Sequence, residues 1–234
     1  MKQSTPFSYL SVQAISTDGA AHTVSVYTDI SAEWTSASDN TQTVVWQSSA
    51  TGPVFTHQVM LETQQDYTEY NDFIMRKFAM LAYHAVRAEF TSILHRGSCL
   101  LFHNERTRVG FSRSRKSEHS PQNGTSTTYQ TGQDIIVRAQ FINNGVLANT
   151  FDTNFRAISD NWPVFAFAQD LGTVSGTSDT VVFAIGHVRD PAVEYIIAGG
   201  EYQARSLYSW SAYPYGVEEM VSTTYDAHLT ILVN

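Results

Sequence analysis

The sequence predicts a mainly β protein, an antiparallel β-sandwich, from three observations. Short runs rich in Val, Ile, Thr, Tyr and Phe recur along the chain, with turn residues between them. Within several of these runs apolar and polar residues alternate, as in strands that bury one face. The length of 234 residues suits one all-β domain with a core that folds without disulfides, and Cys99 is the single cysteine.

The first quarter of the chain is expected to form four strands. They cover residues 7–15, 22–30, 41–47 and 54–62. In the second run, Val26 and Ile30 fall on one face while Tyr27 and Asp29 fall on the other, so one face is expected in the core and the other in water. In the third run Trp46 alternates with its neighbours and is expected in the core.

After residue 127 the same rhythm returns. Residues 135–142 alternate with a period of two, which predicts a strand closed by a turn at residues 143–145. The runs that begin at Pro163 and Thr180 are apolar on both faces, as expected of central strands covered on each side. An apolar run from Tyr195 leads into two consecutive glycines, which predicts a hairpin turn.

A basic stretch interrupts this pattern. Residues 73–119 hold nine Lys/Arg against three Glu, a net charge of +6, whereas the rest of the chain carries −14, and together they give −8. Ile74, Phe78, Leu81 and Ala85 recur at helical spacing. Residues 73–95 are therefore expected to form a basic amphipathic helix. From there to Lys116 neither period is clean.

The basic stretch raises two classes of partner, nucleic acids and membranes. The arginines and lysine of residues 106–116 could neutralise phosphates, and Phe111 could stack on a base. Because the chain as a whole is acidic and no nucleic-acid-binding motif accompanies the cluster, no nucleic-acid partner is expected. No apolar run approaches the roughly 18 residues of a transmembrane helix, so no membrane partner is expected.

No catalytic residue and no cofactor are predicted. No serine lies in a nucleophile-elbow motif, and no glycine-rich phosphate loop is present. His22, His57 and His187 fall on predicted strands, where a lone histidine is usually a packed or surface residue. Four histidines of the basic stretch lack the spacing of zinc ligands, namely His84, His95, His103 and His119.

Three weaker candidates remain. Asp152, Asn154 and Asp160 could offer oxygen ligands to calcium, although such residues more often cap turns. Asn123 begins an Asn-Gly-Thr triplet and is a glycosylation candidate. The tryptophans could form a sugar-stacking surface, although aromatic residues also fill sandwich cores. These are Trp34, Trp46, Trp162 and Trp210.

Two stretches of the chain resemble a known family. The first is YLSVQAISTDGAAHTVSVYTDISAEW (Tyr9–Trp34) with VVWQ (Val44–Gln47), and the second is TTYQTGQDIIVRAQFINNG (Thr127–Gly145), followed by DTNFRAISDNWPVFAFAQDLG (Asp152–Gly172) and VVFAIGHVRDPAVEYI (Val181–Ile196). Both are similar to the N-terminal domain of fungal glutaminase A-like proteins. The resemblance covers roughly residues 9–70 and 125–210.

That resemblance implies a non-catalytic β-sandwich module of a secreted L-glutamine amidohydrolase, which yields glutamate and ammonia. The module would precede an α-helical toroid that holds the catalytic machinery and is its expected partner, so no catalytic residue is carried over. An extracellular parent protein is expected, with its export signal upstream of Met1. The alternative hypothesis is an independent carbohydrate-binding sandwich.

The resemblance also defines the expected organisation of the chain. Residues 1–216 are predicted to be the sandwich module, and residues 217–234 a divergent C-terminal tail. The family would pass quickly from about residue 72 to the segment near Thr127. We therefore hypothesise that residues 73–120 are a non-native insertion, such as translated intron sequence in a gene model.

Overall fold

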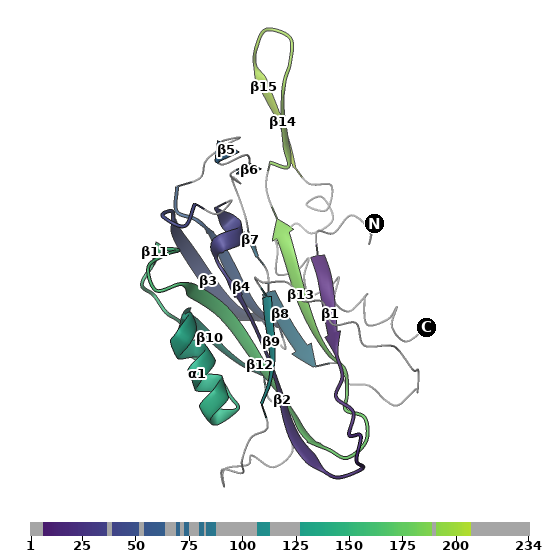
Figure 1. The fold of residues 1–234 in the computed structure, drawn as a ribbon. Coiled ribbons are helices and arrows are strands. Elements are labelled where there is room, and N and C mark those ends of the chain that lie inside the picture. The colour runs from purple at the N-terminus through teal and green to yellow at the C-terminus, as the bar shows by residue number, and fades with distance from the viewer. Residues whose placement is uncertain are drawn as a thin grey trace, which may run out of the picture.

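The computed structural model describes residues 7–36, 39–51, 54–63, 127–188 and 191–206, with the backbone of five short strands between residues 69 and 112. Its main elements form two antiparallel sheets (Figure 1). One sheet has the strand order β1-β13-β8-β4-β3-β11, with β7 also paired to β13, and the other has the order β10-β12-β2-β9. The prediction of a mainly β, antiparallel fold is confirmed.

The strands of the larger sheet are β1 (Phe7–Val12), β3 (Thr43–Thr51), β4 (Val54–Leu61), β7 (Met80–Leu81), β8 (Tyr83–Arg87), β11 (Arg156–Ala157) and β13 (Val181–Val188). The smaller sheet holds β2 (His22–Ser31), β9 (Thr107–Ser112), β10 (Thr127–Gln133) and β12 (Pro163–Val174). The remaining elements are η2 (Glu33–Thr35), β5 (Glu69–Tyr70), β6 (Phe73–Ile74), α1 (Asp134–Asn144), β14 (Val193–Ile196) and β15 (Tyr202–Arg205).

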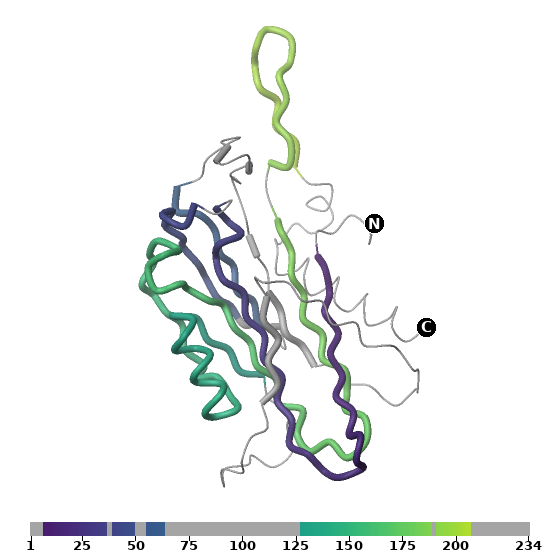
Figure 2. Tube along the Cα trace, in the orientation of Figure 1, coloured from purple at the N-terminus to yellow at the C-terminus, as the bar shows by residue number. Residues whose placement is uncertain are grey.

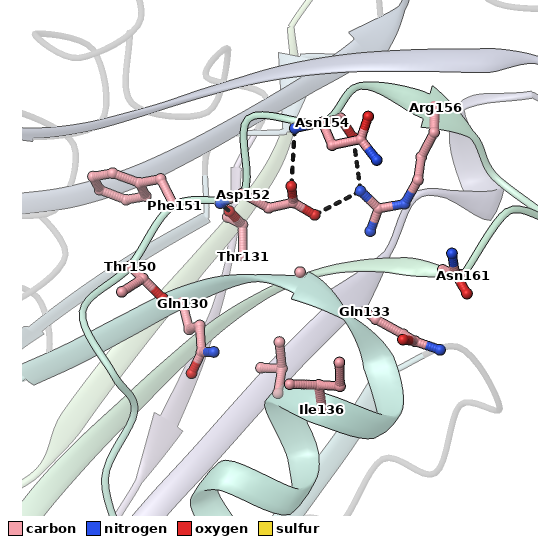
Figure 3. A pocket seen from close by; sticks show the side chains of 12 residues that line it. Gln130, Thr131, Gln133, Ile136, Thr150, Phe151, Asp152, Asn154, Arg156 and Asn161 are labelled. Atoms are coloured by element: carbon pink, nitrogen blue, oxygen red, sulfur yellow. Dashed lines mark hydrogen bonds and ion pairs between the residues drawn. The ribbon is translucent and has the colours of Figure 1, made fainter.

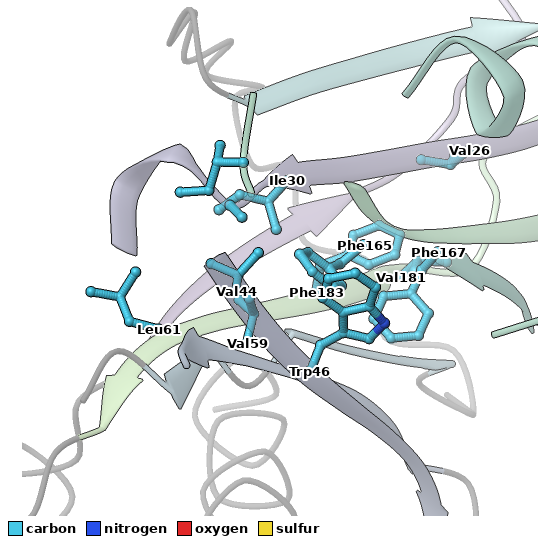
Figure 4. Packing of buried hydrophobic residues seen from close by; sticks show 12 residues of the cluster. Val26, Ile30, Val44, Trp46, Val59, Leu61, Phe165, Phe167, Val181 and Phe183 are labelled. Carbon is cyan, nitrogen blue, oxygen red and sulfur yellow. The ribbon is translucent and has the colours of Figure 1, made fainter. Parts of the chain in front are cut away.

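The hydrophobic core lies between the two sheets. Phe165 and Phe167 of β12 meet Trp46 of β3 and Phe183 of β13 in one buried cluster (Figure 4). Successive side chains of a strand point to opposite faces, so the odd-numbered phenylalanines of β12 all enter this core. Burying each such side chain stabilises the fold by about 1.5–3 kcal/mol. Trp46 is a core residue, as the sequence predicted.

Helix α1 corrects one sequence prediction, since residues 135–142 were expected to form a strand. Val137 and Phe141, one helical turn apart, pack on the outer face of the smaller sheet against Val164 and Tyr27. The ring of Phe141 stacks on that of Tyr27 at a centroid distance of 4.9 Å. The helix ends at Gly145, whose φ of 71° favours glycine and whose N–H donates to the Phe141 carbonyl.

The same helix explains why β12 is apolar on both faces, as predicted. Phe165 and Phe167 of β12 enter the core between the sheets. Val164, Ala166 and Ala168 on the other face of β12 pack in one cluster with α1. An ion pair to a buried carboxylate fixes the helix to the sheet: Arg138 Nε lies 2.7 Å from Asp29 Oδ2, and the Asp29 side chain is 1% exposed. Tyr27 Oη donates to the same carboxylate at 2.6 Å.

The basic stretch corrects a second prediction, since the described parts of residues 73–95 are strands and not a helix. β8 pairs with β4 on one side and with β13 on the other, and β9, further along the chain, pairs with β2. The edges of β4 and β13 offer backbone donors and acceptors to residues 83–87, and such tertiary pairing outweighs a local helical period. Whether residues 73–120 are a non-native insertion stays a prediction.

Two further features complete the described part of the chain. β14 and β15 form a separate hairpin that turns at Gly199 and Gly200, as predicted from the two glycines. Among the described residues no helix has both the length and the apolarity needed to cross a membrane. The predicted tail at 217–234 lies outside the described residues.

Candidate functional site

A depression of about 330 Å³ opens where β10 passes into α1, opposite the loop that follows the helix (Figure 3). Gln130 and Gln133 of β10 and Ile136 of α1 line one wall. Phe151 and Asp152 of the loop line the other. Two of the predicted calcium candidates, Asp152 and Asn154, line this depression.

Arg156 of β11 is the cation around which the loop is built. Its Nη1 donates to Asp152 Oδ2 at 2.5 Å and to the Asn154 carbonyl at 2.7 Å, and its Nε donates to the Asp160 carbonyl at 2.9 Å. The guanidinium also lies over the ring of Trp46, 5.5 Å from the centroid. Arg156 is buried, so these contacts hold the loop in one conformation.

The calcium candidates Asp152, Asn154 and Asp160 do gather here, but around that guanidinium. Asp152 Oδ1 accepts from the Asn154 backbone N–H at 2.9 Å, which is the turn-capping role that such residues have more often. Asp160 Oδ1 accepts from the Asn161 side chain. No group of three or more His, Cys, Asp or Glu suited to a metal occurs in the described ranges. Calcium binding stays a prediction, and calcium would have to compete with Arg156.

The polar groups beside the depression are joined to the loop backbone. Thr131 Oγ1 accepts from the Asp152 N–H at 2.7 Å, and Gln130 Oε1 accepts from the Ala148 N–H at 3.2 Å. The Asp134 N–H at the start of α1 donates to the Trp162 carbonyl. These bonds make the depression a rigid surface feature whose described polar side chains largely serve the fold.

Aromatic side chains surround the same loop. Phe151 stacks on Tyr129 at 4.7 Å, and Phe155 meets the edge of Trp46 at 4.9 Å. Phe155 is 47% exposed and Trp162 is 38% exposed. Asn161 and Trp162 both have positive φ angles, 59° and 37°, so this turn holds the Trp162 backbone in a conformation that bulky residues rarely adopt.

His57 of β4 has a lowered pKa and lies in the core. Its Nδ1 lies 2.6 Å from Ser48 Oγ, and its Nε2 lies 3.2 Å from the Ala166 carbonyl. Because a carbonyl accepts, Nε2 carries the proton and Ser48 donates to Nδ1. Burial lowers the pKa of His57 to about 4, against the opposing effect of its bond to Ala166. The ring also stacks on Phe167 at 4.4 Å, so this is a packed histidine.

The other histidines and tryptophans named from the sequence lie in different parts of the chain, and some of them have no described side chain. His22 pairs with Asp18 at 2.8 Å in an exposed turn, and this bond holds the pKa of Asp18 well below its usual range. His187 meets the edge of Trp34, which is half-buried. Cys99, Asn123, Trp210 and the four histidines of the basic stretch have no described side chain.

Sequence reasoning did not single out Arg156, which organises the candidate site. Its spacing of four from Asp152 was the available signal, because such a pair can close a compact loop. The stacking on Trp46 could not be foreseen from spacing, since these residues are far apart in the sequence.

Comparison with known proteins gives two kinds of match. Residues 1–232 match a family described as a domain of unknown function (DUF5127). The chain is 39% identical over 194 residues to glutaminase A of Aspergillus oryzae, which covers 83% of this chain and 22% of that protein. It is 25% identical over 239 residues to a probable glutaminase of Arthroderma benhamiae, covering 96% of this chain and 22% of that protein.

The chain therefore spans about a fifth of the length of the curated relatives it matches. No solved structure matches it. The resemblance to glutaminase A-like proteins that the sequence predicted is confirmed, and the chain is a glutaminase-related protein.

Proposed function

Since the chain belongs to the family described as a domain of unknown function (DUF5127), we propose that it is a non-catalytic β-sandwich module of a secreted glutaminase A-like protein. The observation that carries this proposal is the 39% identity to glutaminase A over a region that makes up only 22% of that protein. The hydrolysis of L-glutamine would then reside in the rest of the parent protein, and the module would pack against that part.

The structure supports a scaffolding role in physical terms. The core between the two sheets is continuous, and α1 is fixed to the outer face of the smaller sheet by the ion pair of Asp29 and Arg138. His57 is neutral near pH 7 and packed among aromatic rings, and Arg156 is engaged by the loop around it. These titratable groups hold the fold together, as expected of a rigid module.

An ammonia-release assay with L-glutamine tests the proposal. We expect the purified chain alone to release no ammonia. We also expect activity in a chimera, defined as Aspergillus oryzae glutaminase A whose matching segment is replaced by this chain. Glutamine hydrolysis by the chain alone, or a chimera without activity beside an active parent enzyme, would contradict the proposal.

Secretion of the parent protein is tested through Asn123, which lies outside the described residues. A chain that passes through the secretory pathway should gain a glycan at the Asn123 triplet. We expect a mass decrease on enzymatic deglycosylation of the secreted protein, and no change in the Asn123→Gln variant. Retention of the protein inside the source cells would count against secretion.

A carbohydrate-binding module is the second candidate, favoured by the exposed rings of Phe155 and Trp162, which follow the lining residues Asn154 and Asn161 in the sequence. It predicts retention on a glycan array that weakens at least tenfold when Trp162 is replaced by Ala, a loss of about 1.4 kcal/mol. Tyr202→Ala, which changes an exposed ring in β15, is the matched control. Absence of retention, or equal retention by all three proteins, removes this candidate.

A further inference from the structure

The hairpin of β14 and β15 stands apart from the sandwich. It forms a two-stranded sheet of its own, separate from both large sheets. In Figure 1 it projects past the end of β13, and the tube in Figure 2 shows the same projection. A two-stranded hairpin without packing on one face is marginally stable in water, so its position calls for a physical explanation.

Hydrogen bonds close the hairpin on itself. Ala192 N–H donates to the Arg205 carbonyl at 2.7 Å, and Ile197 N–H donates to the Glu201 carbonyl at 2.8 Å. Gly199 and Gly200 have φ angles of 94° and 78°, which fit the turn without strain. Tyr195 Oη donates to the Gln203 side chain across the two strands. The backbone of the two strands is thus paired, whereas none of the described elements outside the hairpin forms a sheet with it or buries its side chains.

Apolar side chains are exposed on both faces of the hairpin. Ile196 faces its cross-strand partner Tyr202, and they are 66% and 71% exposed. Val193 and Tyr195 project from the opposite face, because side chains alternate along a strand, and both are exposed. No residue from 191 to 206 is buried. Clustered exposed apolar residues on a projecting element mark an interaction surface.

We propose that this hairpin is a docking arm that the remainder of the parent glutaminase-like protein covers. The inference rests on the function proposed above. The relatives offer such a cover, since the matched region makes up 22% of each and leaves nearly four fifths of their length outside it. In both relatives the matched region and the remainder belong to one polypeptide, so the covering part would be held close to the hairpin.

Tryptic cleavage after Arg205, an exposed residue at the end of β15, reports whether the arm is covered. In the isolated chain we expect rapid cleavage. In the chimera we expect cleavage at least tenfold slower, because a covered hairpin must open before the protease can bind. In the chimera carrying Ile196→Ser and Tyr202→Ser, the cleavage rate should return toward that of the isolated chain.

The control chimera carries Ile15→Ser and Ile142→Ser, which change residues that are 65% and 69% exposed elsewhere in the fold. It should keep the slow cleavage. An active chimera that is cut after Arg205 as fast as the isolated chain overturns the docking arm and leaves the proposed function standing. An inactive chimera overturns the proposed function, and the docking arm falls with it.

Two further outcomes would also overturn the docking arm. If the isolated chain is a dimer by light scattering and the hairpin substitutions make it a monomer, the cover is a second copy of the chain. If those substitutions lower the melting temperature of the isolated chain by more than about 2 °C, the arm already packs on its own sandwich. We expect a monomer, with a melting temperature that the hairpin pair leaves unchanged.

Discussion

The sandwich and the β14–β15 hairpin are built from the same kind of sequence and differ in what covers their apolar side chains. Phe165 and Phe183 are almost fully buried because the second sheet lies against the first. Ile196 and Tyr202 remain in water because nothing described lies against their two-stranded sheet. An alternating pattern therefore predicts a strand, but a buried face also requires a second layer.

The difference implies two sources of stability. The sandwich supplies its own cover, so substitutions in it should unfold the isolated chain. Substitutions of the exposed residues of the hairpin, in contrast, should leave the stability of the isolated chain unchanged. They should have an effect only when a partner covers the hairpin.

The largest expected effect is in the core. Phe165→Ala removes a ring packed between Trp46 and His57 and should lower the free energy of unfolding by about 3–5 kcal/mol. Urea denaturation followed by tryptophan fluorescence measures it. Phe165→Leu, which keeps most of the volume, is the control and should cost far less. A loss below about 1 kcal/mol for the alanine variant would mean that the two sheets are not packed as described.

The second effect depends on pH. The pKa of His57 is about 4 in the folded protein and 6.5 when unfolded, so the unfolded chain binds more protons between these values. Stability contributed by the neutral ring is therefore complete above pH 6.5 and is lost as the pH falls toward 4. The loss should be about 3 kcal/mol, at 1.4 kcal/mol per pKa unit.

The His57→Phe variant should lose that pH dependence, and its stability at pH 7 should also fall because Ser48 and the Ala166 carbonyl lose a partner. His22→Gln, which changes a partly exposed histidine at the start of β2, is the control. Denaturation curves between pH 7 and pH 4 measure both variants. Equal slopes in wild type and His57→Phe would contradict the buried, neutral state of His57.

The third effect concerns the attachment of α1. Arg138→Ala leaves the buried carboxylate of Asp29 without its cation and should cost about 2 kcal/mol, less than for a fully buried pair because Arg138 is partly exposed. Asp134→Ala removes only the more exposed partner of Arg138 and should cost less than about 1 kcal/mol. If both variants lose the same free energy, the pair of Arg138 and Asp29 does not fix the helix.

The smallest effect is expected in the hairpin. Tyr202→Ser in the isolated chain should change the free energy of unfolding by less than about 0.5 kcal/mol, because its side chain is exposed. Chemical denaturation checks this beside Phe165→Ala. A loss comparable to that of the core variant would abolish the distinction between the two regions.

Much of the sheet structure could be predicted from the sequence because the strands either alternate with a period of two or are short apolar runs bounded by turn residues. Residues 22–30 and the run from Pro163 fall on β2 and β12, the most extensively paired strands of the smaller sheet. Residues 135–142 were wrongly predicted as a strand because Val137 and Phe141 fit both a period of two and a helical turn. The ends of that segment carried the missing signal, with Asp134 in the first turn and Gly145 after the last.

The candidate site was less predictable because it depends on contacts between distant segments. The Asx residues at 152–160 were identified, but the cation among them is Arg156. Its position over the ring of Trp46 follows from the pairing of β11 with β3, which no local pattern reveals. For residues 73–120, sequencing the transcript tests the insertion hypothesis: a spliced message without these codons supports it, and an intact message contradicts it.

Hydrogen–deuterium exchange of the backbone amides compares the two regions most directly. In the isolated chain, amides of β12 should exchange slowly and those of β14 and β15 rapidly. In the chimera with the remainder of glutaminase A, the hairpin amides should slow by at least tenfold while those of β12 stay slow. Hairpin amides that exchange at the same rate in the isolated chain and in an active chimera would contradict the proposal that the rest of the parent protein covers the hairpin.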